Sequence, residues 1–164
     1  MTPGAFSGQR EAQEAMREAL LTALAGEARL LQVWDVEPAQ WPWSDAGLLE
    51  ALSRWARPGR RLQLLAPQYD ELARQHPRFV RWRRDYAHCV QARAVDEGFS
   101  LQGAPLALLL AQLPESCLTL RLFDRRLWRG DLSRETAEHR RAGEWFDAAA
   151  QHAGDSFAPT TLGL

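Results

Sequence analysis

Apolar and polar residues recur along this chain with two periods, and the change from one period to the other predicts its elements. Apolar positions spaced by three or four residues predict helices. Ser7, Ser44 and Ser133 stand where helix caps are expected, and a break is expected at His76-Pro77 because a residue before proline avoids the helical region. The predicted helices cover residues 10–25, 44–57, 68–87 and 133–153.

Shorter runs of apolar or alternating residues predict strands. Residues 118–123 alternate, and the polar residues 124–126 predict a hairpin turn into a further antiparallel strand. Residues 105–113, PLALLLAQL, are too short for periodicity to separate a buried helix from a strand, and we favour a helix that begins with Pro105. The remaining predicted strands cover residues 28–35, 60–66 and 89–95.

The order of these elements predicts the fold class. The spacing between the strands at 28–35 and 60–66 leaves room for one crossover helix, which favours a right-handed βαβ unit with parallel strands. We therefore expect an α/β fold, in which residues 1–153 form a single three-layer domain with a mixed, mainly parallel sheet flanked by helices. Residues 154–164 are polar and contain proline, and we expect them to form a loosely packed C-terminal tail.

Composition excludes several kinds of chemistry. The chain has 164 residues and a formal net charge of -1, so a nucleic-acid site would have to be a local patch. It contains no Lys, Asn or Ile, which indicates a GC-rich, bacterial genome. Without lysine there is no phosphate-binding lysine of the Walker type and no Schiff base.

Cysteine and histidine spacing gives no sign of a metal or cofactor site. Cys89 and Cys117 are too far apart for a zinc or redox motif, and buried reduced thiols are expected. The four histidines show no paired helical spacing, so we expect no metal and no cofactor. Residues 1–25 lack the pattern of a signal peptide and no apolar run is long enough to span a membrane, so a soluble cytoplasmic protein is expected.

The order of helices and strands, ending in a late hairpin, resembles one half of the phospholipase D-like fold. The local likeness lies in GRRLQLLAP at residues 59–67 and in the hairpin. The resemblance implies a motif HxKxxxxD on a strand, whose histidine forms a phosphohistidine and whose lysine neutralises phosphate, followed by Gly-Ser on the next strand. With Asp124 as the aspartate, Cys117 stands in place of the histidine and Thr119 in place of the lysine, and Gly130-Asp131 replaces Gly-Ser.

These departures predict a phospholipase D-like domain that is not catalytic, as in bacterial proteins of unknown function. Such a domain would act in binding or interaction. The resemblance also implies a homodimer, because that fold normally pairs two halves across a two-fold axis. The seven tryptophans of the chain would supply interface anchors. A cysteine nucleophile at position 117 is the alternative to a buried structural thiol.

The loop after the strand at 28–35 is a second candidate site. Ligands in open α/β sheets favour the carboxyl ends of parallel strands, where this loop begins. Asp35 and Glu37 would form a carboxylate pair, with Trp41 and Trp43 as a stacking wall, in an enzyme that acts on a phosphoester or in a phosphate binder. In the alternative interpretation the rings close over the core and Asp35 caps a turn or pairs with an arginine.

The segment HPRFVRWRRDYAH, residues 76–88, raises the question of nucleic-acid binding. On a helix its three aromatic rings fall on one stripe, while Arg78, Arg81 and Arg84 lie to the side and Arg83 borders the stripe. A groove for single-stranded nucleic acid needs exposed rings between cations, so this separation favours a core-packing helix. The three arginines remain candidates for binding a phosphate-containing ligand or nucleic acid.

Overall fold

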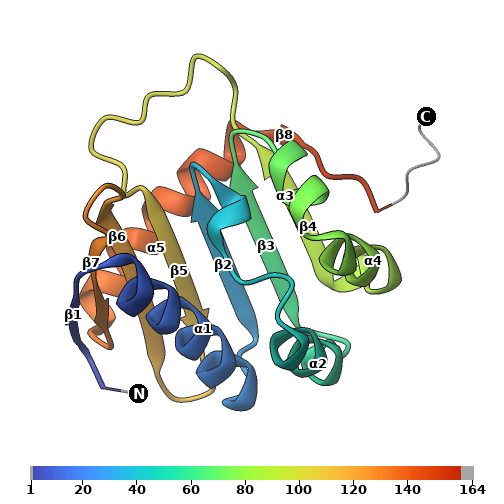
Figure 1. Ribbon diagram of the computed structural model, residues 1–164, viewed down its shortest axis with the longest axis horizontal. Coiled ribbons are helices and arrows are strands. Elements are labelled where there is room, and N and C mark those ends of the chain that lie inside the picture. Colours follow the sequence, from blue (N-terminus) through green and yellow to red (C-terminus); the bar gives the residue numbers. More distant parts are fainter. Residues whose placement is uncertain (1, 160–164) are drawn as a thin grey trace.

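The computed structural model describes residues 2–159, and these form one mixed sheet with helices on both faces (Figure 1). The order of the eight strands across the sheet is β1-β7-β6-β5-β2-β3-β4-β8. The strands are β1 (Gly4–Phe6), β2 (Leu30–Asp35), β3 (Arg61–Ala66), β4 (Val90–Ala94), β5 (Ala107–Gln112), β6 (Cys117–Asp124), β7 (Arg129–Ser133) and β8 (Gly154–Asp155). The helices are α1 (Gln9–Ala25), α2 (Ala46–Trp55), α3 (Asp70–Gln75), α4 (Pro77–Asp85) and α5 (Thr136–Gln151), with short 3-10 turns at Pro38–Gln40 and Ala87–Cys89.

The predicted fold class is confirmed. Strands β2, β3 and β4 run parallel, with α2 and then α3 and α4 as the connections between them. The other neighbouring strands are antiparallel, so the sheet is mixed as predicted but is not mainly parallel, because among residues 2–159 only the pairs β2–β3 and β3–β4 are parallel. The break between α3 and α4 falls at His76-Pro77, as the proline predicts.

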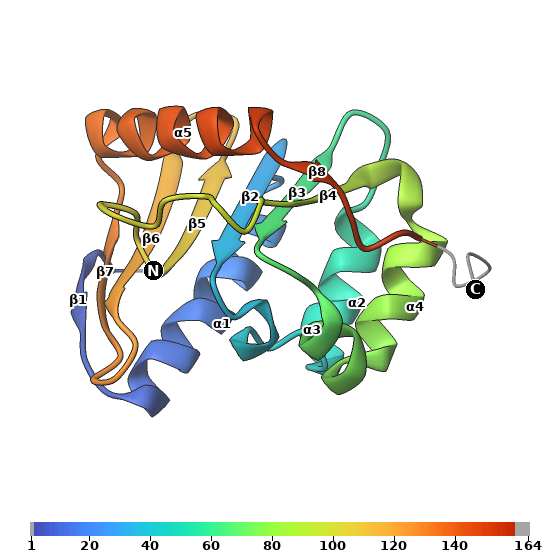
Figure 2. The same cartoon turned by 90° about the horizontal axis from the view of Figure 1, so that it is seen from above.

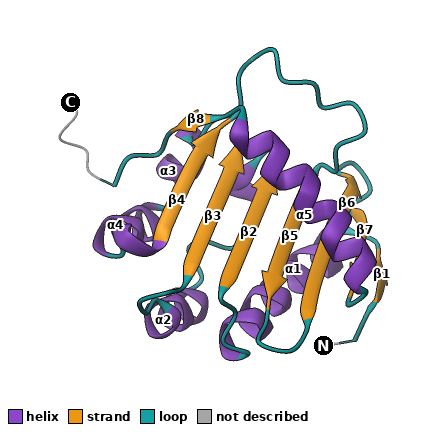
Figure 3. Cartoon of the chain, turned by 180° about the vertical axis from the view of Figure 1, so that it is seen from behind, coloured by secondary structure: helices purple, strands orange, loops and turns teal. Residues whose placement is uncertain are grey.

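Each face of the sheet has its own apolar core. Helices α1 to α4 cover one face, and α5 alone crosses the described strands diagonally on the other (Figures 2 and 3). The larger core lies under α1 to α4 and includes the fully buried side chains of Met16, Leu31 and Leu120. The smaller core lies under α5, where Phe146 packs with Trp34 and Leu108. Successive side chains of one strand therefore pack into the two different cores, on opposite faces of the sheet.

Residues 105–113 are not a helix, contrary to the prediction from the sequence. They contain strand β5, which pairs antiparallel with both β2 and β6. Residues 107–111 of this strand are buried because helices cover both faces of the sheet at this position. A strand buried on both faces has no alternation of polar and apolar residues, so its sequence cannot be told from that of a buried helix.

Helix caps and the chain ends also differ from the predictions. Asp45, and not Ser44, caps α2 by accepting a hydrogen bond from the backbone N–H of Leu48. Gly8 precedes α1 in place of Ser7, and Ser133 ends β7 and lies before α5. The tail is packed as far as Phe157, because β8 pairs with β4 and the Phe157 ring stacks on Tyr69. Residues 160–164 of the predicted loose tail lie outside the described residues.

Candidate functional site

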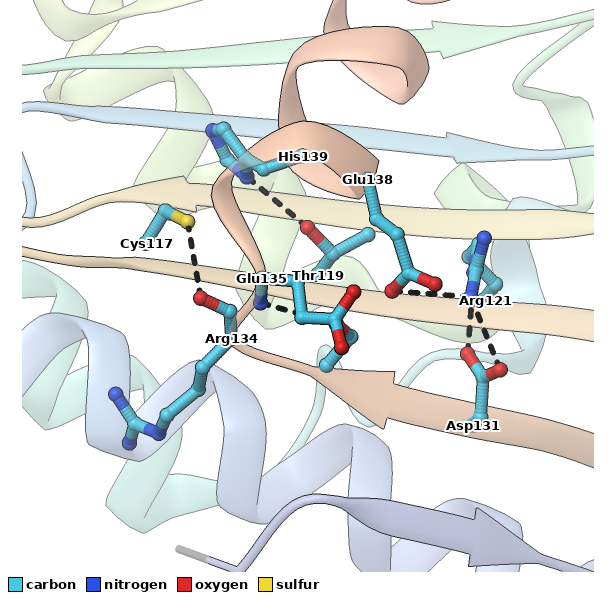
Figure 4. A network of polar contacts seen from close by, with 9 residues as sticks. Cys117, Thr119, Arg121, Asp131, Arg134, Glu135, Glu138 and His139 are labelled. Atoms are coloured by element: carbon cyan, nitrogen blue, oxygen red, sulfur yellow. Dashed lines mark hydrogen bonds and ion pairs between the residues drawn. The ribbon is translucent and has the colours of Figure 1, made fainter.

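Strand β6, which carries the degenerate phospholipase D-like motif, directs alternate side chains to the two faces of the sheet. Leu118, Leu120 and Leu122 are fully buried in the larger core. Thr119 and Arg121 instead contact residues of α5 on the opposite face, and Cys117 lies beside the segment that leads into α5 (Figure 4). Two of the motif positions, 117 and 119, are therefore brought to one polar surface between β6 and α5.

Thr119 stands where the resemblance places a lysine, and its hydroxyl is engaged within the protein. Its side chain is fully buried, and Oγ1 lies 3.0 Å from Nδ1 of His139 on α5. Burial lowers the pKa of His139, which favours a neutral imidazole at this contact. The arginine-rich sequence around His139 does not reveal that this turn of α5 faces β6.

Cys117 stands where the resemblance places the nucleophilic histidine. Its Sγ atom donates to the backbone carbonyl of Arg134 at 3.6 Å. Burial raises the pKa of the thiol, so the reactive thiolate is disfavoured near neutral pH. The remaining motif residue, Asp124, accepts a hydrogen bond from the backbone N–H of Leu127 at 2.9 Å and closes the hairpin turn.

Arg121 supplies the one positive charge that β6 directs toward α5. Its Nε and Nη2 atoms lie 3.1 and 3.0 Å from the carboxylate oxygens of Asp131, and Nη2 lies 3.4 Å from Glu138. A side-chain hydrogen bond with Ser133 is the main cause that lowers the pKa of Glu138, which keeps this carboxylate ionised. Two carboxylates therefore hold the Arg121 guanidinium in position.

A cavity of about 260 Å³ opens beside this network. Arg121, Glu138 and Arg141 line its polar side, and Pro105, Phe123 and Trp145 are among the residues of its apolar side. The Arg121 guanidinium also lies over the Phe123 ring, 5.3 Å from its centroid. The cavity therefore combines an apolar, partly aromatic wall with two cations and one carboxylate.

The second candidate site, at the carboxyl end of β2, is closed by Arg125. The Asp35 carboxylate is fully buried and accepts hydrogen bonds from the backbone N–H of Glu37 and from Nε1 of Trp41, both at 2.7 Å. Arg125 of the β6–β7 hairpin also pairs with it. Burial opposes the negative charge more than Arg125 favours it, and the pKa of Asp35 is raised to about 6.

The four predicted residues of this candidate site differ in their exposure and contacts. Glu37 is half exposed and its Oε2 lies 3.5 Å from Nε of Arg125, so the predicted carboxylate pair is brought together around one arginine. Trp41 and Trp43 are each 1% exposed and pack in the core, which leaves no ring face for a ligand. The alternative interpretation, in which the rings close over the core and Asp35 pairs with an arginine, describes this arrangement.

Helix α4 separates its rings from its arginines. Phe79 and Trp82 are buried, whereas Arg78, Arg81 and Arg84 are exposed. The nearest carboxylate to Arg84 is that of Asp85, 3.9 Å from its Nε atom, and no ion pair of Arg78 or Arg81 occurs among residues 2–159. The fourth arginine of the segment, Arg83, is buried, which its position at the border of the stripe did not reveal.

Within residues 2–159, no group of three or more His, Cys, Asp or Glu side chains is arranged to hold a metal ion. In this same part of the chain, none of the helices has the length and apolar character needed to cross a membrane.

Two solved structures have a similar fold. One is TrmBL2, an archaeal chromatin protein with a novel mode of DNA binding, at a TM-score of 0.56 and 15% identity over 93% of this chain and 54% of that one. The other is Nuc, a phospholipase D family member from Salmonella typhimurium, at a TM-score of 0.53 and 10% identity over 94% of this chain and 98% of that one. The chain thus spans about half the length of TrmBL2 and nearly all of Nuc.

At these identities the likeness establishes the fold alone, and the predicted phospholipase D-like architecture is confirmed. No family model matches the chain, and no curated protein sequence matches it.

Proposed function

We propose that this chain is a phospholipase D-like domain without phosphodiesterase activity, and that it acts as an interaction module. The observation that carries the proposal is the state of Arg121, whose guanidinium is held by Asp131 and Glu138. Phosphoryl transfer needs a nucleophile and a free positive charge that receives the phosphate oxygens. At the motif positions, Thr119 is bonded to His139 and Cys117 has a raised pKa, and both observations support the absence of this activity.

An assay against a generic phosphodiester, such as bis(p-nitrophenyl) phosphate, tests this proposal. We expect no turnover above the buffer rate for the wild-type chain. The variants Cys117→Ser and Asp35→Ala cover the two alternatives, a cysteine nucleophile and an acid-base pair at Asp35. Activity in the wild type that disappears in either variant would show that the chain is an enzyme and would overturn the proposal.

We propose further that the interaction includes pairing with a second copy of the chain. Tryptophans are poor candidates for the interface, because six of the seven are buried and contribute to the core. The β6–β7 hairpin instead carries the exposed side chains of Phe123 and Leu127, which are 55% and 46% accessible. Exposed apolar side chains on one hairpin are candidates for an interaction surface.

Sedimentation velocity over a wide range of concentration tests this pairing. We expect a dimer for the wild type and a monomer for Phe123→Ser/Leu127→Ser. Arg126→Ser is the matched control, because it changes an exposed residue of the same hairpin without removing apolar surface. A wild-type chain that stays monomeric at all concentrations would exclude the homodimer.

A second candidate function is binding to nucleic acid through α4. It is supported by the exposed arginines of that helix, and the structurally similar TrmBL2 is described as binding DNA. The net charge of -1 limits such binding to a local and salt-sensitive patch.

A further inference from the structure

Arg83 is the most deeply buried cation on α4. Its side chain points inward beside Phe79 and Trp82, and the residue is 6% exposed. The guanidinium lies 5.8 Å from the centroid of the Phe157 ring, and its Nε atom donates to the backbone carbonyl of Phe157 at 3.2 Å. Arg83 thus holds the tail against α4, and the contact uses only one of its five N–H groups.

This buried charge lacks a negative partner. Among residues 2–159, no carboxylate forms an ion pair with Arg83, and its Nη1 atom has no hydrogen-bond acceptor. The neighbouring Tyr69 does not supply a charge, because burial raises the pKa of its phenol and its hydroxyl donates to the carbonyl of Arg93. A buried guanidinium without a counter-ion is costly, and such groups are normally paired with an anion.

A cavity of about 460 Å³ adjoins Arg83. Its other walls are the edge of β4 at Val90–Ala92 and two parts of the tail, Asp155–Ser156 and Ala158–Pro159. Figures 1 and 2 show the tail running from β8 past β4 toward α4. The one carboxylate in the lining, that of Asp155, is 91% exposed and faces Arg93, with 3.8 Å between Oδ1 and Nε.

The strand edge at this cavity is partly open. Strand β8 pairs with β4 only at Arg93 and Ala94, and the N–H of Ser156 adds a hydrogen bond to the carbonyl of Ala92. Val90 and Gln91 lie beyond this pairing and line the cavity, within the part of the chain that the structure describes. An extended segment placed here would find backbone groups of the strand edge beside the guanidinium.

We propose that this cavity binds a carboxylate group, with Arg83 as its counter-ion, supplied either by a small organic acid or by the C-terminus of an extended peptide. A carboxylate matches a single guanidinium in charge and geometry. A phosphate dianion fits less well, because the lining holds no second cation and Asp155 lies at the rim. This site is separate from β6 and α5, so its test is independent of the function proposed above.

Isothermal titration calorimetry with the full chain tests the proposal. The probes are acetate, neutral acetamide, inorganic phosphate, and an Ala-Val tetrapeptide with either a free or an amidated C-terminus. We expect acetate and the free peptide to bind, acetamide and the amidated peptide not to bind, and phosphate to bind more weakly than acetate. If the free peptide binds more tightly than acetate, the carboxylate group comes from a peptide C-terminus that also contacts the β4 edge. If the two affinities are equal, the ligand is a small organic acid.

Two variants and one control locate the site. Arg83→Gln should weaken carboxylate binding by roughly tenfold or more, since a charge-assisted contact is lost. Ala158→Trp should weaken it to a similar degree by filling the cavity from an exposed tail position, without altering the guanidinium. Arg81→Gln removes an exposed arginine of the same helix and should leave the affinity unchanged.

Folding of each variant is checked by circular dichroism. If Arg83→Gln does not fold, the affinity of Ala158→Trp for the carboxylate probes tests the site. Carboxylate binding that persists in both folded variants would overturn the proposal. Phosphate binding tighter than that of acetate would overturn the assigned ligand class, and absence of acetate and peptide binding to the wild type would overturn the site itself.

Discussion

The hydroxyl of Thr119 on β6 and the imidazole of His139 on α5 lie 3.0 Å apart, and their contact joins the sheet to the helix that covers its second face. Thr119 is fully buried, so its Oγ1 atom has no access to solvent. A buried hydroxyl needs a partner, and His139 provides one. The position that the phospholipase D-like motif reserves for a phosphate-binding lysine therefore serves the packing of two layers.

Thr119→Val should lower the free energy of unfolding by about 1–3 kcal/mol. Valine keeps the shape of threonine but leaves Nδ1 of His139 without its partner at a half-buried position. Urea unfolding of the purified variant measures the change. Thr2→Val, at an exposed position before β1, is the control and should change stability by less than about 0.5 kcal/mol. Equal stability of Thr119→Val and wild type would show that the contact contributes nothing.

His139 should titrate below its usual pKa. Burial lowers the pKa of this side chain in the folded protein, so the folded chain binds a proton less readily than the unfolded chain. The stability that the neutral ring contributes is present above the unfolded value of about 6.5 and is lost as the pH falls through the folded value. An NMR titration of the four histidine ring signals checks this, with His139→Gln to assign the resonance. A pKa of His139 at or above that of a histidine in an unfolded peptide would contradict this expectation.

Much of the fold could be predicted from the sequence where polar and apolar residues recur with a regular period. Helix α1 has buried residues spaced by three or four, and strand β6 places Thr119 and Arg121 between leucines. Strand β5 could not be predicted, because helices cover both of its faces and remove the polar positions that reveal a strand. Strand β1, with three residues at the sheet edge, is too short to produce any pattern.

The candidate sites were harder to predict because their partners are distant in the sequence. Asp35 and Arg125 are separated by 90 residues and meet because the β6–β7 hairpin lies near the end of β2. Arg83 differs from its neighbours on α4 only by its position on the helix, and the tail residue that it contacts, Phe157, is 74 residues away. Spacing along the chain identifies residue types suited to a site, whereas their pairing depends on tertiary contacts.

Gly130→Ala should destabilise the protein by at least about 2 kcal/mol. A Cβ atom at this position would lie 2.0 Å from the backbone oxygen of Arg121 and 2.6 Å from Cζ of Phe6, so the three strands at this edge would have to separate. Gly143→Ala on α5 is the control, because a Cβ atom there meets nothing within 4 Å. The control should gain about 0.5–1 kcal/mol from the lower flexibility of the unfolded chain. Urea unfolding measures the free energy of unfolding of both variants. A Gly130→Ala variant as stable as the wild type would contradict the close spacing of the strands at this position.

Asp35 should make the protein more stable as the pH falls from 7 to 5. Its pKa is raised from 3.8 in the unfolded chain to about 6 in the folded one, so the folded protein takes up the proton first. The stability of the wild type relative to Asp35→Asn should therefore rise by on the order of 1 kcal/mol between these two pH values. The comparison with the variant removes the contributions of other titrating groups. A difference that stays constant or falls on acidification would mean that Arg125 outweighs burial.

If α4 binds nucleic acid, the double variant Arg81→Glu/Arg84→Glu should abolish the binding, since both arginines are exposed and would contact phosphates. Affinity of the wild type for a short DNA duplex should fall steeply with salt, and each phosphate contact contributes roughly 0.9 to the slope of log affinity against log salt concentration. Fluorescence anisotropy at several salt concentrations measures both effects. Arg10→Glu/Arg54→Glu is the matched control, because it makes the same change of charge at exposed arginines that pair with glutamates on α1 and α2. Equal loss of binding in the two double variants would indicate an effect of net charge alone, and binding independent of salt would exclude phosphate contacts by α4.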